Sequence, residues 1–94
     1  MTLVTFDPAK RARTLRERGL DFADAAEMFD GLIATAPDLR RDYGEARFVT
    51  AGTLAGRLVV VVWTPREDAH HIISMRHAHA AEAALWQVRM DRPG

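Results

Sequence analysis

The sequence contains no cysteine, and this absence excludes three kinds of chemistry. A disulfide framework, a cysteine nucleophile and a thiolate metal site all need that residue, and its absence is compatible with a reducing compartment. Long apolar runs are also missing: the longest, residues 58–63, suits a buried strand, whereas a membrane-spanning helix needs about 20 apolar residues. The first residues lack the basic and then apolar pattern of a secretory signal. We therefore expect a cytoplasmic protein without a membrane segment.

The chain also lacks an excess of either charge. Its 13 basic residues balance 13 acidic ones, whereas nucleic-acid-binding proteins usually carry a positive excess. Lys10 is the only lysine, however, and the other basic residues are arginine, which binds phosphate through two parallel hydrogen bonds. A high genomic G+C content also raises the arginine fraction. With 94 residues, 48% of them hydrophobic, the chain is expected to form one domain over residues 1–94.

Capping signals predict two helices in the first third of the chain. A short strand is expected over residues 2–6. Asp7 and Pro8 are then typical of the N-cap and first position of a helix. This helix is expected to end at Gly19, because glycine readily adopts the left-handed C-cap conformation. A second helix is expected over residues 22–29, where apolar residues repeat at helical spacing.

The following part of the chain shows strand-like patterning. Four strands are predicted, over residues 32–36, 47–54, 57–64 and 70–75. Ala55 and Gly56 have the spacing of a hairpin turn, and the unbroken apolar residues 59–62 indicate a central strand. A last helix with one apolar side is expected over residues 78–89. We therefore predict an α+β fold with two N-terminal helices, an antiparallel β-sheet meander and a C-terminal helix.

No motif for metal, serine or nucleotide chemistry is present. His70 and His71, and likewise His77 and His79, lack the third and fourth ligands that a zinc site needs. Ser74 is the only serine and has no nucleophile elbow around it. Glycine-rich phosphate loops are absent as well. We therefore expect neither a metal nor a cofactor.

Charged and imidazole side chains gather near the ends of the predicted strands. Glu45 and Arg47 are two residues apart and face the same side of a strand. They form either an exposed ion pair, worth less than about 1 kcal/mol, or a carboxylate that orients a phosphate-binding arginine. His71 lies in the last predicted strand, and Arg76 and His77 lie between the end of that strand and the last helix. They are either solvated side chains or the base, cation and acid that RNA cleavage without a metal requires.

Side-chain alternation limits this second interpretation. His71 and Arg76 are an odd number of residues apart, so they face opposite sides of one straight strand. Both reach the same surface only if the strand ends before Arg76, as the approach of the last helix suggests.

Five segments, taken in order, resemble the motifs of one family. Residues 6–10 are similar to F-x-W/D-x-x-K with one position fewer, residues 18–25 to H-G-V-x-F-x-x-A, residues 42–49 to x-x-G-E-x-R-F-x, residues 52–61 to the first ten positions of G-x-x-x-G-R-x-L-x-V-V, and residues 72–78 to I-I-S-A-R-x-A. These are motifs of the BrnT toxins. The resemblance implies a RelE-like fold and a ribonuclease toxin that arrests growth by cutting RNA without a metal.

The resemblance also implies a partner and a set of site residues. The partner is a BrnA-like ribbon–helix–helix antitoxin, which neutralises the toxin and alone contacts operator DNA, so that the pair represses its own operon. A homodimer and a heterotetramer with the antitoxin both stay open. The hypothesis assigns catalytic roles to phosphate ligands (Arg76 and Arg47), to a group that orients Arg47 (Glu45) and to a proton carrier (His71 or His77). Lys10 and Arg57 are expected to contact RNA. Trp86 either docks the antitoxin or a second copy, or completes the core.

Three departures from the family pattern keep another function open. His71 stands where an arginine is common, His77 stands where a lysine is common, and the last helix is almost uncharged. One alternative is therefore a catalytically weak or inactive relative that binds an antitoxin and takes part in operon autoregulation. Another is an unrelated small binding domain. The discriminating feature is whether histidine and arginine side chains converge on one open surface.

Overall fold

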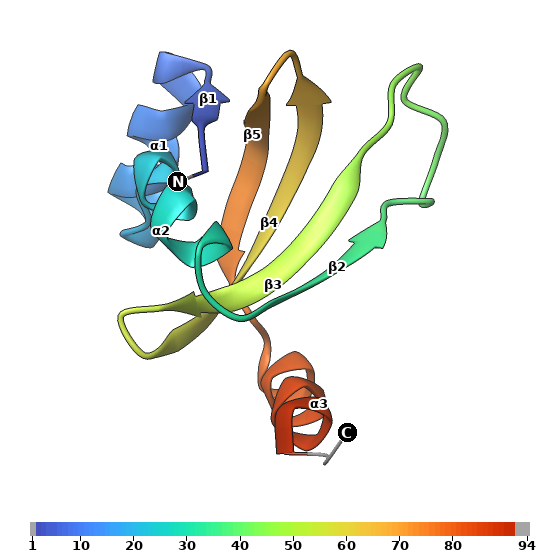
Figure 1. The fold of residues 1–94 in the computed structure, drawn as a ribbon. Coiled ribbons are helices and arrows are strands. Elements are labelled where there is room, and N and C mark those ends of the chain that lie inside the picture. Colours follow the sequence, from blue (N-terminus) through green and yellow to red (C-terminus); the bar gives the residue numbers. More distant parts are fainter. Residues whose placement is uncertain (1, 92–94) are drawn as a thin grey trace.

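The structure, a computed structural model, describes residues 2–91 and the side chains of residues 2–88. Its elements in chain order are β1 (Val4–Phe6), α1 (Pro8–Arg18), a 3-10 turn η1 (Phe22–Asp24), α2 (Ala25–Phe29), β2 (Ile33–Pro37), β3 (Phe48–Leu54), β4 (Arg57–Arg66), β5 (Ala69–His77) and α3 (Ala80–Asp91) (Figure 1). The predicted start and end of α1 are confirmed: the Asp7 side chain accepts a hydrogen bond from the backbone of Ala9, and Gly19 has φ 69°. The second predicted helix is instead divided into η1 and the short α2.

The strands form one mixed sheet in the order β1-β5-β4-β3-β2. The antiparallel meander from β2 to β5 and the central place of β4 are confirmed. β1, however, pairs with β5 in parallel, with Thr5 opposite His71. The short strand expected over residues 2–6 is present, but it joins the sheet as β1 ahead of both helices. The prediction of a wholly antiparallel sheet that follows two N-terminal helices is therefore wrong. Thr5 and His71 are 66 residues apart in sequence, and no local signal encodes such a pairing.

Helices α1 and α2 lie on one side of the sheet (Figure 1) and cover the core. Phe22 and Met28 share one buried cluster with Val59 and Val61 of β4. Gly52 in β3 permits the close approach of α2, because a Cβ atom at this position would lie 2.7 Å from the Met28 Cγ. Val59 and Val61 are therefore buried against the helices, which accounts for every second residue of the apolar run in β4.

The opposite face of the sheet, called the open face below, carries Val60 and Val62 of β4 and flanks α3. Val60 is buried, as expected for a central strand. α3 lies beyond the end of β5 (Figure 1) and leaves Leu85 and Val88 each 56% exposed. An apolar groove of about 250 Å³, called the α3 groove below, separates the helix from the open face and is lined in part by Val60, Leu85 and Trp86.

Candidate functional site

A bulge in β5 brings His71 and Arg76 to the same face of the sheet. The pairing of β4 with β5 shifts by one residue between Val62 and Trp63, which leaves Ile73 as an extra residue in β5. Such a residue shifts the alternation of the side chains that follow it. Both His71 and Arg76 therefore lie on the open face, although strict alternation would separate them. The expectation that the strand ends before Arg76 is wrong, because β5 continues past it.

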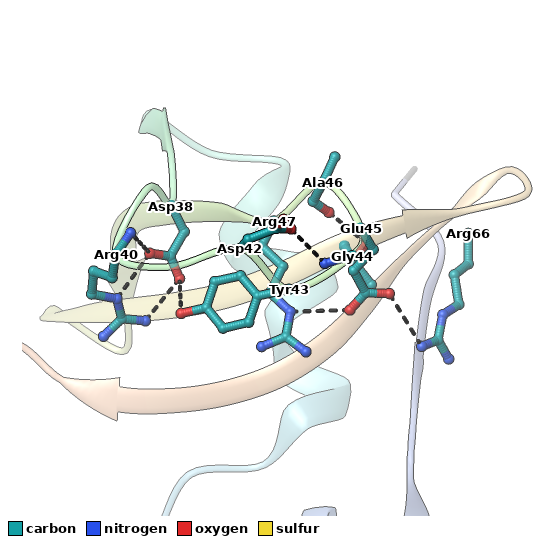
Figure 2. A network of polar contacts seen from close by, with 10 residues as sticks. Asp38, Arg40, Asp42, Tyr43, Gly44, Glu45, Ala46, Arg47 and Arg66 are labelled. Atoms are coloured by element: carbon teal, nitrogen blue, oxygen red, sulfur yellow. Dashed lines mark hydrogen bonds and ion pairs between the residues drawn. The ribbon is translucent and has the colours of Figure 1, made fainter.

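Arg47 directly precedes β3 and lines a hollow of about 370 Å³ with Val62 and Ser74. Its Nε donates to Glu45 Oε2 over 3.0 Å, so the predicted contact between these two residues is present. The guanidinium carbon lies 3.9 Å from the centroid of the Tyr43 ring (Figure 2), a stacking arrangement that is favourable for arginine. Among the described residues, no acceptor binds its two terminal nitrogens. They can therefore donate to the oxygens of an anion.

A buried carboxylate holds the loop that carries Tyr43. Asp38 accepts two hydrogen bonds of 2.8 Å from Arg40 and one of 3.3 Å from the Tyr43 hydroxyl (Figure 2). Its backbone N–H also donates to the carbonyl of Arg47 over 2.8 Å. The bonds from Arg40 hold the pKa of the Asp38 carboxyl well below its usual range, so this carboxylate is charged at neutral pH. The network thereby fixes Tyr43 beside Arg47.

His71 lies near the Glu45 end of the open face. Its Nδ1 is 2.8 Å from the hydroxyl oxygen of Thr5. Arg66 lies 3.8 Å from the second oxygen of Glu45 and links that carboxylate to β4 (Figure 2). Burial lowers the pKa of His71, and the charges of Arg66 and Lys10 lower it further, while the charge of Glu45 opposes them. The imidazole is therefore neutral at pH 7 and able to accept a proton.

Arg76 shares the open face but already has an anionic partner. Its terminal nitrogens donate to the two carboxylate oxygens of Glu82 in α3, over 2.8 and 2.9 Å. Hydrogen bonding to Arg76 lowers the pKa of Glu82 to about 2. Glu82 also accepts from the backbone N–H of His79 over 2.8 Å at the start of α3. A phosphate that binds Arg76 must therefore compete with Glu82.

Two of the predicted residues lie away from this surface. His77 pairs with Val59 and so lies on the face covered by the helices, where its Nδ1 is buried with no hydrogen-bond partner among the described residues. Arg57 is exposed at the start of β4, about 30 Å from Arg66 at the other end when each residue adds about 3.3 Å. The structure therefore does not bring His77 or Arg57 together with His71 and Arg47.

Two further predicted residues lie beside the open face. Lys10 in α1 lines a hollow of about 390 Å³ with Arg13 and Ser74, so it approaches the bulge from the helix side. Trp86 in α3 lines the α3 groove together with Leu85. Lys10 therefore lies beside the bulge, where its charge acts on His71, and Trp86 lies beside the open face.

Sequence reasoning missed three contributors to this surface, Thr5, Tyr43 and Arg66. Tyr43 reaches Arg47 only through the loop conformation that the Asp38 network holds, so the spacing of the two residues in sequence gave no signal. Thr5 and Arg66 reach the site only through strand pairing. His70, the neighbour of His71, has a different role: its ring centroid lies 4.1 Å from that of Trp63 and 4.4 Å from that of Phe29.

In the part of the chain that the structure describes, no three histidine, cysteine or acidic side chains gather as a metal site. No helix in that part is long and apolar enough to cross a bilayer.

Comparison with known families identifies the chain. A family described as the ribonuclease toxin, BrnT, of type II toxin–antitoxin systems matches residues 6–82. This range contains the Glu45–Arg47 pair, His71 and Arg76, and it covers most of the chain. A search of curated proteins found no match. Membership of a toxin–antitoxin family implies an antitoxin partner. The chain therefore belongs to the BrnT family of ribonuclease toxins of type II toxin–antitoxin systems.

Proposed function

We propose that the protein is a metal-independent endoribonuclease of the cytoplasm that arrests growth by cutting RNA on the open face of its sheet. The observation that carries the proposal is the bulge at Ile73, which places His71 and Arg76 on the face that also holds Arg47. A neutral imidazole and a guanidinium with free donors are the groups that such cleavage needs. The helices packed on one side of an antiparallel meander also support a RelE-like arrangement.

In the proposed reaction, His71 Nε2 takes the proton of a ribose 2′-OH. The 2′-oxygen then bonds to the adjacent phosphorus, and the bond between phosphorus and the 5′-oxygen breaks. The leaving 5′-oxygen takes a proton from solvent. The products are a 2′,3′-cyclic phosphate and a 5′-hydroxyl. His77 lies on the other face, so the proton transfer is assigned to His71 alone.

Arg47 is the proposed ligand of the scissile phosphate. Its Nε is held by Glu45 and its plane by Tyr43, so the two terminal nitrogens are oriented before the substrate arrives. Preorganised donors of this kind stabilise the charge that develops in the transition state. Arg76 is proposed as a second cation for the same phosphate or its neighbour. Lys10 is proposed to contact RNA close to this face.

Arg57 is proposed to contact RNA only outside the catalytic surface. Its position at the far end of β4 requires a substrate that extends along the whole sheet. Arg57→Ala is therefore a matched control for Arg47→Ala, since each variant removes one arginine at the beginning of a strand. We expect Arg47→Ala to lose about 10²-fold in kcat/KM and Arg57→Ala to lose less than about threefold, the value of one surface contact.

The experiment that tests the proposal uses purified protein and a radiolabelled RNA with and without EDTA. The expected result is cleavage that survives EDTA and leaves a 2′,3′-cyclic phosphate, together with growth arrest on induced expression. A folded parent protein that leaves RNA intact, or cleavage that EDTA abolishes, would contradict the proposal.

We further propose that the antitoxin is a BrnA-like ribbon–helix–helix protein that docks in the α3 groove against Trp86. The groove is apolar, and it adjoins a hollow that shares Val49 and Val60 with it and includes Arg40 and Arg76. An antitoxin segment with apolar residues for the α3 groove and acidic residues for the adjoining hollow would fit both surfaces and cover the proposed site. Operator DNA is then contacted through the antitoxin alone.

This docking is tested by co-expression with the product of the neighbouring reading frame. Trp86→Ala should weaken the complex, whereas Leu32→Ala, which truncates an exposed apolar side chain outside the α3 groove, should not. The mass of the complex distinguishes a heterodimer from a heterotetramer. A Trp86→Ala protein that binds like the parent would exclude the α3 groove as the docking surface.

One observation favours a second function. Arg76 is bound by Glu82, and the helix that carries Glu82 offers few cations for RNA. A protein whose Arg76 stays bound to Glu82 would bind an antitoxin and take part in operon autoregulation without cutting RNA. The parent protein would then leave RNA intact and yet repress its operon together with the antitoxin, a combination that the same growth and cleavage assays detect.

A further inference from the structure

The only side-chain partner of His71 in the described structure is a hydroxyl from the opposite end of the chain. Thr5 Oγ1 lies 2.8 Å from His71 Nδ1. The two residues are direct neighbours in the parallel pairing of β1 with β5. Val4 and Phe6 pack against the core, so Thr5 between them faces the open side of the sheet. The contact is therefore set by the register of β1 and not by chance proximity.

A bond at Nδ1 determines which nitrogen a substrate meets. No group of the described residues bonds to Nε2, so this nitrogen is left for the reacting hydroxyl. A neutral imidazole carries its proton on one nitrogen only, and the bond at the other end of the ring selects which one. If Nδ1–H donates to Thr5, Nε2 has a lone pair and can act as a base. If Thr5 donates to Nδ1, Nε2 carries the proton and cannot.

The catalytic role proposed for His71 requires the first arrangement, because only a lone pair on Nε2 can accept the proton of the 2′-OH. Charges of both signs surround the ring: Arg66 and Lys10 lower the pKa of His71, whereas Glu45 and Asp7 raise it. The charged groups that act on the ring or line the hollow beside it come from four parts of the chain. They are α1 and its cap (Asp7, Lys10), the loop before β3 (Glu45), the end of β4 (Arg66) and the β4–β5 connection (Glu67, Asp68). Glu45 is itself paired with Arg47 and Arg66.

We propose that Thr5 is a positioning residue, which accepts a hydrogen bond from His71 Nδ1–H and thereby keeps Nε2 unprotonated and available as the base for the 2′-OH. This inference rests on the proposed function for its consequence in catalysis. Thr5 does not touch the substrate. It acts in both protonation states, because the imidazolium formed when the base takes a proton also donates from Nδ1, and more strongly.

The first test is spectroscopic and does not depend on RNA cleavage. Nitrogen-15 NMR distinguishes the two tautomers of His71 and follows its titration. The parent should show a proton on Nδ1. In Thr5→Val the population should move toward the Nε2–H tautomer, and the pKa of His71 should fall because the charged ring loses its acceptor. Thr5→Ser should restore both properties. Thr53→Val, the same change on an exposed residue of β3, should leave His71 unchanged.

The second test is kinetic. With a short RNA substrate, Thr5→Val should lose about tenfold in kcat, as expected for one hydrogen bond to a charged donor, with KM little changed and the acid limb of the pH profile moved to lower pH. Thr5→Ser should recover most of the loss. His71→Ala should lose about 10²-fold or more, as expected for removal of a general base.

The outcomes separate the inference from the function on which it rests. A parent protein with the proton on Nε2, or a folded Thr5→Val protein with an unchanged tautomer, would refute the inference whatever the activity. Thr5→Val activity equal to the parent beside an inactive His71→Ala would refute it and leave the proposed function standing. If the parent cuts no RNA, the proposed function fails, and the NMR result alone decides whether Thr5 positions His71.

Discussion

The pair formed by Arg76 and Glu82 joins the open face to α3, and its removal has opposite effects on stability and on RNA binding. We consider Glu82→Gln, which keeps the size of the side chain and removes its charge. The two side chains are 37% and 39% exposed, so solvent screens their attraction strongly. A bidentate pair at this exposure contributes about 1 kcal/mol to the free energy of unfolding. For a domain of this size, that corresponds to a melting temperature lower by about 5 °C.

The pH dependence of this loss follows from the direction of the pKa shift. The pKa of Glu82 is lowered from 4.5 to about 2 by its bond to Arg76. A carboxyl with a depressed pKa in the folded state stabilises the protein above its unfolded pKa and loses this contribution as the pH falls through the folded value. The parent and Glu82→Gln should therefore differ at pH 7 and converge between about pH 4.5 and pH 2. Glu27→Gln, an exposed position of α2 with no ion pair among the described residues, should match the parent throughout.

RNA binding should change in the other direction. Without the Glu82 charge, Arg76 is available to one more phosphate, so the affinity for a single-stranded RNA should rise. The plot of log K against log salt concentration should become steeper by about 0.7, the value for one phosphate neutralised on a single strand. The assay is fluorescence anisotropy with a noncleavable 2′-O-methyl RNA at several salt concentrations. An unchanged slope, or a weaker affinity in a folded Glu82→Gln protein, would show that Glu82 does not compete with phosphate.

Three further predictions concern the site and the core. Arg76→Ala should lower the rate of RNA cleavage by about 10²-fold, the usual loss for one positioned cation; a folded variant with parental activity would remove Arg76 from the site. Tyr43→Ala should raise KM or lower kcat by severalfold because Arg47 loses its stacking surface, whereas Tyr43→Leu should recover part of the loss; equal rates for all three proteins would contradict this role. Gly52→Ala should destabilise the fold by about 1–3 kcal/mol, as expected for overpacking, because the new Cβ would lie 2.7 Å from the Met28 side chain. Urea denaturation measures this loss, and an unchanged midpoint would show that Met28 moves aside freely.

Much of the secondary structure was predictable because its determinants are local. The caps at Asp7 and Gly19 depend on residues within one helical turn, and the β3–β4 hairpin depends on two adjacent residues. The central place of β4 was visible in its unbroken apolar run, because only a strand buried on both faces carries one. The contact between Glu45 and Arg47 was likewise predictable, since two positions along an extended chain return to the same side. The family motifs are also contiguous in sequence, and they indicated the ribonuclease toxin class.

Only the tertiary structure decided which side chains of the candidate site lie together on the open face. The parallel pairing of β1 with β5 brings Thr5 to His71 across 66 residues of sequence, and loop closure over that length leaves no local pattern. The bulge at Ile73 reverses the expected relation between His71 and Arg76, because it depends on the register of β5 against β4 and not on the residues of β5 alone. The occupation of Arg76 by Glu82 depends in turn on where α3 lies after the strand ends. The sequence alone thus determined which chemical groups are present, and the pairing of distant strands determined which of them share a face.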